Sequence, residues 1–271
     1  MSEQRPLARR LAGRGAPVAF ANGGMMTFSS WEPVAAPLRD EFATLLFDFR
    51  GQMLSPGAPP ESTSDLFAWH ADQLASLLDE VGWESAHLVA TSFGAMVATT
   101  LAARHPKRVR SLLLATVMDR ATEALDRQTA GSRELVAGIL AGGERTRFWD
   151  LLVEGVYSPA HRVARAAEFA ARRAQLDLLP LSWFSGLDQL LAAVEGFDLT
   201  AALPAVRCPV CVVIAAGDRV MDVERSHALA SALRAETVVH PTAGHALVAE
   251  DPAWLAEVCR DFLTRAEEHS R

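Results

Sequence analysis

The chain has 271 residues, of which half are hydrophobic and 22% are charged, and its formal net charge is −7. This length fits one large α/β domain, or a domain with an insertion, and it allows a full hydrophobic core. An acidic chain is poorly suited to bind nucleic acid, and neither a secretory signal nor an apolar run long enough for a membrane helix is found. We therefore expect a cytoplasmic protein without nucleic-acid or membrane partners; the sequence does not indicate its oligomeric state.

Short, continuous apolar runs recur along the chain and predict its strands. Runs of this kind are typical of strands that are buried on both faces of a parallel sheet. Amphipathic segments lie between them, so strands and helices alternate as in a doubly wound α/β sheet. The six expected strands cover residues 18–21, 44–48, 87–90, 109–115, 210–215 and 237–240.

Two amphipathic segments illustrate the expected helices. The first follows three candidate capping residues at 62–64 and ends at Gly82. Capping side chains before a periodic apolar pattern, and a glycine after it, are the usual helix boundaries. The second covers 254–263, near the C-terminus. The apolar face of the first helix is expected to consist of Leu66, Leu74, Leu77, Leu78 and Val81.

The alternation of strands and helices stops between residues 119 and 200, where the pattern is helical throughout. We expect this segment to be a helical cap inserted into an α/β core made of residues 1–118 and 201–271. Helices placed over a sheet edge often act as a lid on a site. The alternative is a helical subdomain that adds bulk only.

The segment "CPVC" has the spacing of a redox motif. It coincides with an expected strand, on which two residues separated by three positions face opposite sides. We therefore interpret Cys208 and Cys211 as small core residues.

A serine is expected at a sharp turn between the strand at 87–90 and the following helix. The turn has small residues, Ala90 and Gly94, two positions before and two positions after Ser92. Small residues are needed there because a tight strand-to-helix turn leaves no room for side chains. Such a pentapeptide arises often by chance, so the interpretation of Ser92 as a nucleophile needs a histidine base and a carboxylate.

Both partners have candidates just beyond later strands, where open α/β sheets carry their functional loops. The acid candidate is Asp218, and Asp222, four residues further on, is its rival. The histidine candidate is His245, which follows the last strand, with His240 as the nearest competitor. Serine hydrolases of different folds have these three residues in different chain orders, and the order nucleophile, acid, histidine is specific to one of these folds.

Three segments, "HLVATSFGAMVATTLAARHP", "CPVCVVIAAGDRVMDVE" and "TAGHALVAEDPAWLAEVCRDFL", resemble the nucleophile, acid and histidine segments of the α/β-hydrolase superfamily. The resemblance implies a mostly parallel, doubly wound sheet with a helical cap. It also implies that Ser92 is the nucleophile, His245 the base and Asp218 the orienting acid. A serine nucleophile places the chain outside the branches that use aspartate.

The same resemblance implies an oxyanion hole made of two backbone N–H groups, those of Phe93 and Gly24. The loop that carries Gly24 is similar to the family's His-Gly-x loop, with Asn22 in place of the histidine. The segment "DFRGQMLS", at 48–55, is similar to the family's Asp-x-Arg-Gly-x-Gly-x-Ser turn, with Met53 in place of the second glycine. The short N-terminus leaves little room for the family's usual first hairpin.

These residues predict acyl chemistry that needs neither a cofactor nor a metal. The expected partner is a small acyl substrate, an ester, lactone or thioester, whose acyl part is apolar. Two alternatives stay open: an acyltransferase, because the Asn-Gly-x-Met loop is similar to that of acyltransferases of rhamnolipid precursor synthesis, or a hydrolase-fold ligand sensor. The candidate pocket residues are Met25, Trp149, Trp183, Phe184 and Met221.

Overall fold

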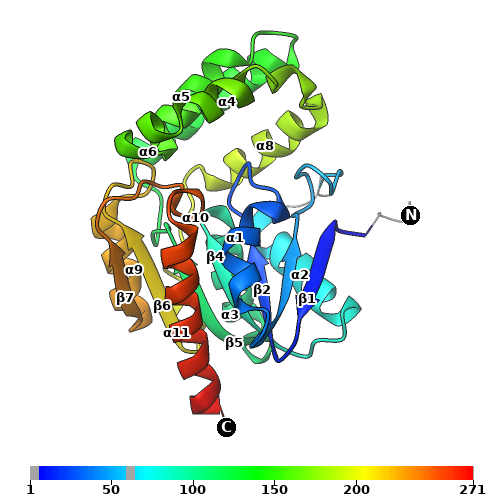
Figure 1. Cartoon of the computed structure of the whole chain (residues 1–271), viewed down its shortest axis with the longest axis vertical. Coiled ribbons are helices and arrows are strands. Elements are labelled where there is room, and N and C mark those ends of the chain that lie inside the picture. Colours follow the sequence, from blue (N-terminus) through cyan, green and yellow to red (C-terminus); the bar gives the residue numbers. More distant parts are fainter. Residues whose placement is uncertain (1–5, 59–64, 271) are drawn as a thin grey trace.

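The computed structural model describes residues 6–58 and 65–270, and these residues form a sheet flanked by helices (Figure 1). In this part of the chain the sheet has seven strands in the order β1-β3-β2-β4-β5-β6-β7, and β1 alone is antiparallel to its neighbour. The six strands predicted from apolar runs are confirmed. The strands are β1 (Arg9–Gly13), β2 (Ala16–Ala21), β3 (Phe42–Phe47), β4 (Ala86–Thr91), β5 (Val109–Ala115), β6 (Val210–Ala215) and β7 (Glu236–His240).

Strand β1 was not predicted from the sequence. It pairs antiparallel with β3, from Arg9 opposite Phe47 to Gly13 opposite Ala43, and not with the next strand β2, so among the described residues β1 and β2 do not form a hairpin. Its residues are mostly exposed, so no apolar run marks it in the sequence. Charged side chains on an edge strand are a common protection against unwanted strand pairing.

Helices cover both faces of the sheet, and successive strand residues pack against alternate layers. On β4, Leu88 and Ala90 belong to the apolar cluster that includes α2, α3 and α9, whereas Val89 belongs to the cluster with α1 and α11. This alternation explains why the strands are apolar throughout. These helices are α1 (Glu32–Ala35), α2 (Leu66–Glu80), α3 (Phe93–Arg104), α9 (Val223–Leu233), α10 (Leu247–Glu250) and α11 (Pro252–Ser270), with short 3₁₀ turns at Phe28–Trp31, Ala36–Leu38, Pro106–Arg108 and Leu203–Ala205.

The start of α2 differs from the predicted one. The capping candidates at 62–64 lie outside the described residues, and the side chain of Asp65 accepts a hydrogen bond from the Ala68 N–H at 2.9 Å. Leu74, Leu77 and Leu78 are buried as expected. The expected apolar face of α2 is therefore confirmed at its centre, while its end residues, Leu66 and Val81, are only partly buried.

Residues 123–194 form a separate layer, shown in green above the sheet in Figure 1 and called the helical layer below. The chain leaves the sheet and returns to it at one place, where Arg120 and Asp198 form an antiparallel bridge. The layer has an apolar cluster of its own, separate from the two clusters that flank the sheet. Its elements are α4 (Glu123–Leu140), α5 (Thr146–Val156), α6 (Pro159–Ala164), α7 (Ala166–Arg173), a 3₁₀ turn (Leu176–Leu178) and α8 (Leu181–Val194).

The two cysteines of the "CPVC" segment pack on opposite sides of the sheet. Cys208 contacts the cluster around α2 and α3, and Cys211 belongs to the cluster around α11. Cys208 lies just before β6 rather than on it. Both thiols are free, and burial raises the pKa of Cys208 to about 11 and that of Cys211 to about 12. A thiol with so high a pKa is a poor nucleophile, in agreement with the role of core residues.

Within residues 6–58 and 65–270, none of the helices combines the length and the apolar character that a bilayer crossing requires.

Candidate active site

Ser92 occupies a strained turn between β4 and α3. Its backbone angles, φ 51° and ψ −123°, lie outside the regions that L-residues usually adopt. The turn is held on the sheet because the Ser92 N–H donates to the Ala115 carbonyl at 3.1 Å. A Cβ atom on Gly94 would lie 2.5 Å from the carbonyl oxygens of Ala21 and Asn22. Glycine is therefore required at position 94, as the small-residue pattern predicted.

His245 and Asp218 lie next to this serine. The His245 Nε2 atom is 3.0 Å from the Ser92 Oγ atom, and its Nδ1 atom is 2.9 Å from Asp218 Oδ2. The other carboxylate oxygen of Asp218 accepts hydrogen bonds from the N–H groups of Val220 and Met221, at 2.8 and 2.9 Å. A carboxylate only accepts, so the Nδ1–H group donates to it and Nε2 is left to accept the serine proton.

The two rival residues have other functions in the structure. Asp222 caps α9, and its Oδ1 atom accepts a hydrogen bond from the Arg225 N–H at 2.9 Å. His240 Nδ1 accepts from the Ala243 N–H at 2.9 Å, so this ring shapes the loop that leads to His245. The structure thus brings Asp218 and His245 to Ser92, and not their rivals.

The candidate oxyanion donors come from α3 and from the loop after β2. Phe93 is the first residue of α3, where backbone N–H groups have no partner within the helix. In the loop, Gly23 packs against the nucleophile, because a Cβ atom added to it would lie 3.4 Å from the Ser92 Cβ atom. A Cβ atom added to Gly24 would meet nothing within 4 Å. The next residue, Met25, has a left-handed backbone with a φ of 66°. The Gly23–Gly24 peptide therefore lies beside the serine, with open space at Gly24.

A buried polar network supports this loop, and sequence reasoning missed it. The Asn22 Nδ2 group donates to Asp48 Oδ1 at 3.1 Å and to Gln52 Oε1 at 3.2 Å. The Gln52 Nε2 group donates to the Gly23 carbonyl at 2.9 Å. Burial raises the pKa of the Asp48 carboxyl, although the hydrogen bonds that it accepts act in the opposite direction. The only signal in the sequence was the motif-like segment 48–55.

A second missed residue, Glu250, joins the histidine loop to the helical layer. Its Oε1 atom accepts hydrogen bonds from the Gly244 N–H at 3.1 Å and from the Ser158 N–H at 2.8 Å. The Ala246 N–H donates to the Val156 carbonyl at 2.9 Å. Both neighbours of His245 are thus tied to the start of α6 and the end of α5.

The predicted pocket residues separate into two groups. Trp183 and Phe184 are buried in the apolar cluster of the helical layer, and Met25 packs against that cluster. Trp149 contacts Phe169 elsewhere in the layer, with ring centroids 6.5 Å apart. Met221 is buried beside Asp218 in the apolar cluster that includes α2, α3 and α9. Three of the five side chains therefore belong together.

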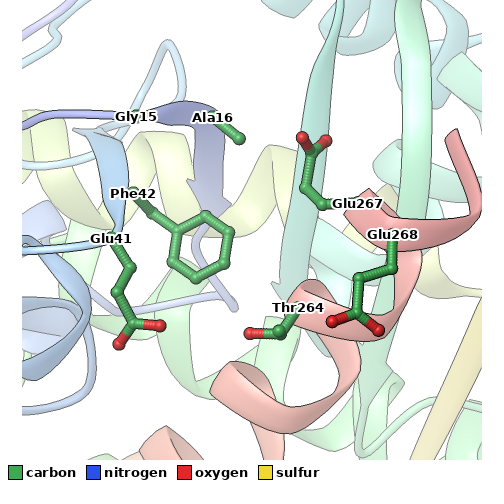
Figure 2. A pocket seen from close by; sticks show the side chains of 7 residues that line it. All are labelled: Gly15, Ala16, Glu41, Phe42, Thr264, Glu267 and Glu268. Atoms are coloured by element: carbon green, nitrogen blue, oxygen red, sulfur yellow. The ribbon is translucent and has the colours of Figure 1, made fainter. Parts of the chain in front are cut away.

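A hollow at the far end of β2 is unconnected with these residues. Figure 2 shows Glu267, Glu268 and Thr264 of α11 opposite Phe42, near the start of β2. The remaining lining residues are Gly15, Ala16 and Glu41. Because β2 begins at this hollow and ends at the loop of Gly23, which packs against Ser92, the two sites lie at opposite ends of the strands. The Glu267 carboxylate is already bound to His87 and Arg110, so we place the candidate site at Ser92.

Comparison with known proteins gives consistent results over most of the chain. A family model of the α/β hydrolase fold matches residues 16–252. The 2-hydroxymuconate semialdehyde hydrolase of Pseudomonas sp. strain CF600 is 29% identical over 273 residues, covering 94% of this chain and 89% of the relative.

Solved structures are similar in fold. MGS-M2, an α/β hydrolase enzyme from a Medee basin deep-sea metagenome library, has a TM-score of 0.87 at 21% identity, over 95% of this chain and 94% of its own. A thermophilic esterase from Thermogutta terrifontis has a TM-score of 0.82 at 24% identity, over 96% and 93%. At these identities the likeness extends to the fold alone.

Proposed function

The chain belongs to the α/β hydrolase fold family, and we propose that it is a serine hydrolase that cleaves an ester, lactone or thioester with an apolar acyl part. The observation that carries this proposal is the continuous path from Ser92 Oγ through His245 to Asp218, with atoms 3.0 and 2.9 Å apart. A serine hydroxyl becomes a useful nucleophile only when a base of this kind accepts its proton.

The proposed reaction has two halves. In the first, Ser92 Oγ bonds to the substrate carbonyl carbon while its proton passes to His245 Nε2. His245 then gives this proton to the leaving group as the carbonyl–oxygen or carbonyl–sulfur bond breaks. In the second half, water loses a proton to His245 and attacks the acyl carbon. The bond between the acyl carbon and Ser92 Oγ then breaks, and Oγ takes the proton from His245, which releases the acid and restores the serine. Asp218 holds the imidazole in the required tautomer throughout.

The backbone N–H groups of Phe93 and Gly24 are the proposed donors to the negative oxygen that forms in both halves. Both are supported from nearby, because the Ser92 N–H is bound to the Ala115 carbonyl and the Gly23 carbonyl is bound to the Gln52 side chain. Losing one donor of this type typically reduces the rate by ~10²–10³.

The apolar side chains of the helical layer support the proposed substrate class. The position of this layer supports its proposed role as a lid. The layer contacts the loops that follow β3 and β7, through Gly186 and Ser158. Trp183 and Phe184 form its apolar cluster, and Met25, next to the proposed donor Gly24, packs against them. An apolar acyl chain is the group that such surroundings favour. We propose that residues 119–200 act as a cap over the site.

A time course with p-nitrophenyl esters, from acetyl to dodecanoyl, tests this function at enzyme concentrations that resolve a burst. We expect sustained turnover that Ser92→Ala lowers by about 10⁴–10⁶-fold, and a fluorophosphonate adduct on wild type but not on Ser92→Ala. Equal labelling of the two proteins would refute the assignment of Ser92.

The same time course separates the hydrolase from an acyltransferase, which the Asn22–Met25 loop favours as second candidate. A stoichiometric burst that stalls, and resumes when a 3-hydroxyacyl acceptor is added, would identify an acyltransferase. A burst that stalls with every acceptor would identify a ligand sensor.

A further inference from the structure

We propose that Gln52 is a positioning residue that fixes the orientation of the second oxyanion donor, the N–H group of Gly24. This inference rests on the proposed serine hydrolase function. Gln52 touches no reacting atom; it acts through the peptide group that joins Gly23 to Gly24.

The orientation of the Gln52 amide follows from its partners. Its Oε1 atom accepts hydrogen bonds from the Phe49 N–H at 2.9 Å and from Asn22 Nδ2 at 3.2 Å. Its Nε2 group faces the Gly23 carbonyl at 2.9 Å. Turning the amide by 180° would set donors against donors and an oxygen against the carbonyl, so only one orientation is compatible with the site.

The Gly23 carbonyl and the Gly24 N–H belong to a single planar, trans peptide group and point in opposite directions. A hydrogen bond that holds the carbonyl toward Gln52 therefore turns the N–H away from segment 48–55. Gly23 itself packs against Ser92. The hydrogen bond thus decides which way the proposed donor points beside the nucleophile.

This peptide needs an external restraint because glycine restricts its own backbone least of all residues. The peptide joins two glycines, and the next residue, Met25, has the left-handed φ of 66°. The Met26 N–H also reaches the Gly23 carbonyl, at 3.4 Å, which is a weak contact. Gln52 supplies the shorter bond from a buried position, where 3% of the residue is exposed and water competes little.

The variant Gln52→Glu replaces the donor by an oxygen and adds a negative charge when it is ionised. One carboxylate oxygen can still accept from Phe49 and Asn22, but the side chain no longer donates to the Gly23 carbonyl, which keeps only the weak contact with the Met26 N–H. We expect kcat and kcat/KM for p-nitrophenyl butanoate to fall together by about 10–10²-fold with KM unchanged, because the contact acts on the transition state alone. An alkyl boronic acid, which mimics the tetrahedral intermediate, should bind more weakly by the same factor.

The pH profile separates positioning from a general structural role. A protonated carboxyl can donate to the Gly23 carbonyl again, so the kcat ratio of Gln52→Glu to wild type should rise as the pH is lowered. Measuring both proteins at each pH cancels the titration of groups that they share. Gln52→Met, which is similar in shape and has no donor, should lose kcat without this recovery, and it replaces Gln52→Glu if that variant does not fold.

Ser55→Ala is the matched control in the same segment. It removes the hydrogen bond that the Ala8 N–H donates to Ser55 Oγ at 2.8 Å and leaves the Gly23 carbonyl untouched. Wild-type kcat in the Gln52 variants, or an equal loss of kcat in Ser55→Ala, would overturn the positioning role. Ser92→Ala in the same assay tests the proposed function separately: if it stays active, the function itself is wrong.

Discussion

The loops at the carboxyl ends of the strands, which carry Ser92, Asp218 and His245, and the helical layer are held in place in different ways. In these loops the candidate groups are held by hydrogen bonds with nearby backbone groups. Asp218 accepts from two backbone N–H groups, and the Ser92 N–H donates to the Ala115 carbonyl. The helical layer instead has its own small apolar cluster, and it is joined to the rest of the molecule by apolar packing as well as by polar and backbone contacts, since Met25 packs against this cluster and Leu190 belongs to the cluster on the sheet. The candidate catalytic groups are thus positioned by the sheet and its loops, and the helical layer packs over them as a separate unit.

Two of the contacts between these regions, called joints below, bear on whether the layer can open. At one, Gly51 and Gly186 touch so closely that a Cβ atom on Gly186 would lie 1.9 Å from the Gly51 carbonyl oxygen. At the other, Glu250 links Ser158 to the Gly244 N–H, next to His245. If the layer opens as a lid, the first joint has to separate and the second is the natural pivot, since it holds the base in place.

The largest expected effect is a loss of kcat at the carboxyl ends of the strands. Asp218→Asn should lower kcat by about 10⁴-fold, because an amide in place of the carboxylate favours the wrong tautomer of His245. Asp222→Asn is the matched control, since asparagine can still cap α9, and it should retain wild-type kcat. Steady-state kinetics on p-nitrophenyl butanoate checks both. A reversed pair of results would exchange the roles of the two aspartates.

A smaller effect is expected at the joint between Gly51 and Gly186. Gly186→Ala should lower the free energy of unfolding by about 1–3 kcal/mol, because the added methyl group overlaps the Gly51 carbonyl. It should also change the preference among acyl chain lengths, while fluorophosphonate labelling of Ser92 keeps its rate.

Gly131→Ala is the control for this joint. Gly131 is an exposed residue of α4 around which an added Cβ atom meets nothing within 4 Å. Alanine there should raise the free energy of unfolding by about 0.5–1 kcal/mol, as expected for a helix interior. Urea denaturation measures both variants. Equal stability of the two would mean that the layer is not tightly joined at Gly51.

The sequence predicted those features that depend on local pattern. Six strands were marked by continuous apolar runs, and the turn at Ser92 was marked by the small residues around it. Strand β1 was missed because an exposed edge strand needs no apolar run. The start of α2 was misplaced because serine, threonine and aspartate are nearly equivalent as caps.

Contacts between distant segments could not be predicted in this way. Gln52 reaches Gly23 across 29 residues of sequence, and Glu250 reaches Ser158 across 92. Neither residue type signals such a partner. Apolar composition likewise could not show that Trp183 and Met25 share one cluster while Met221 lies in another. Which side chains meet depends on how the helical layer is placed on the sheet.

We also predict a pH dependence of stability, which arises from a histidine buried against Phe93, the residue after Ser92. His70 is buried edge-on against Phe49 and Phe93, and burial, with a further contribution from the Arg50 charge, lowers its pKa to about 3. In the unfolded chain a histidine has a pKa of about 6.5. Between these two values the unfolded state binds a proton that the folded state does not, so the stability present above pH 6.5 is lost as the pH falls.

His70→Phe should remove this dependence on pH, since phenylalanine fills a similar space and takes up no proton. We expect the free energy of unfolding of wild type to fall more steeply than that of the variant between pH 6.5 and 5, by at most about 1.4 kcal/mol per pH unit. His227→Gln, on the exposed face of α9, should keep the wild-type slope. Urea denaturation at several pH values measures all three proteins. If the free energy of unfolding had the same slope against pH in wild type and His70→Phe, His70 would take up its proton in the folded state. The region around Ser92 would then be less rigid than its hydrogen bonds indicate.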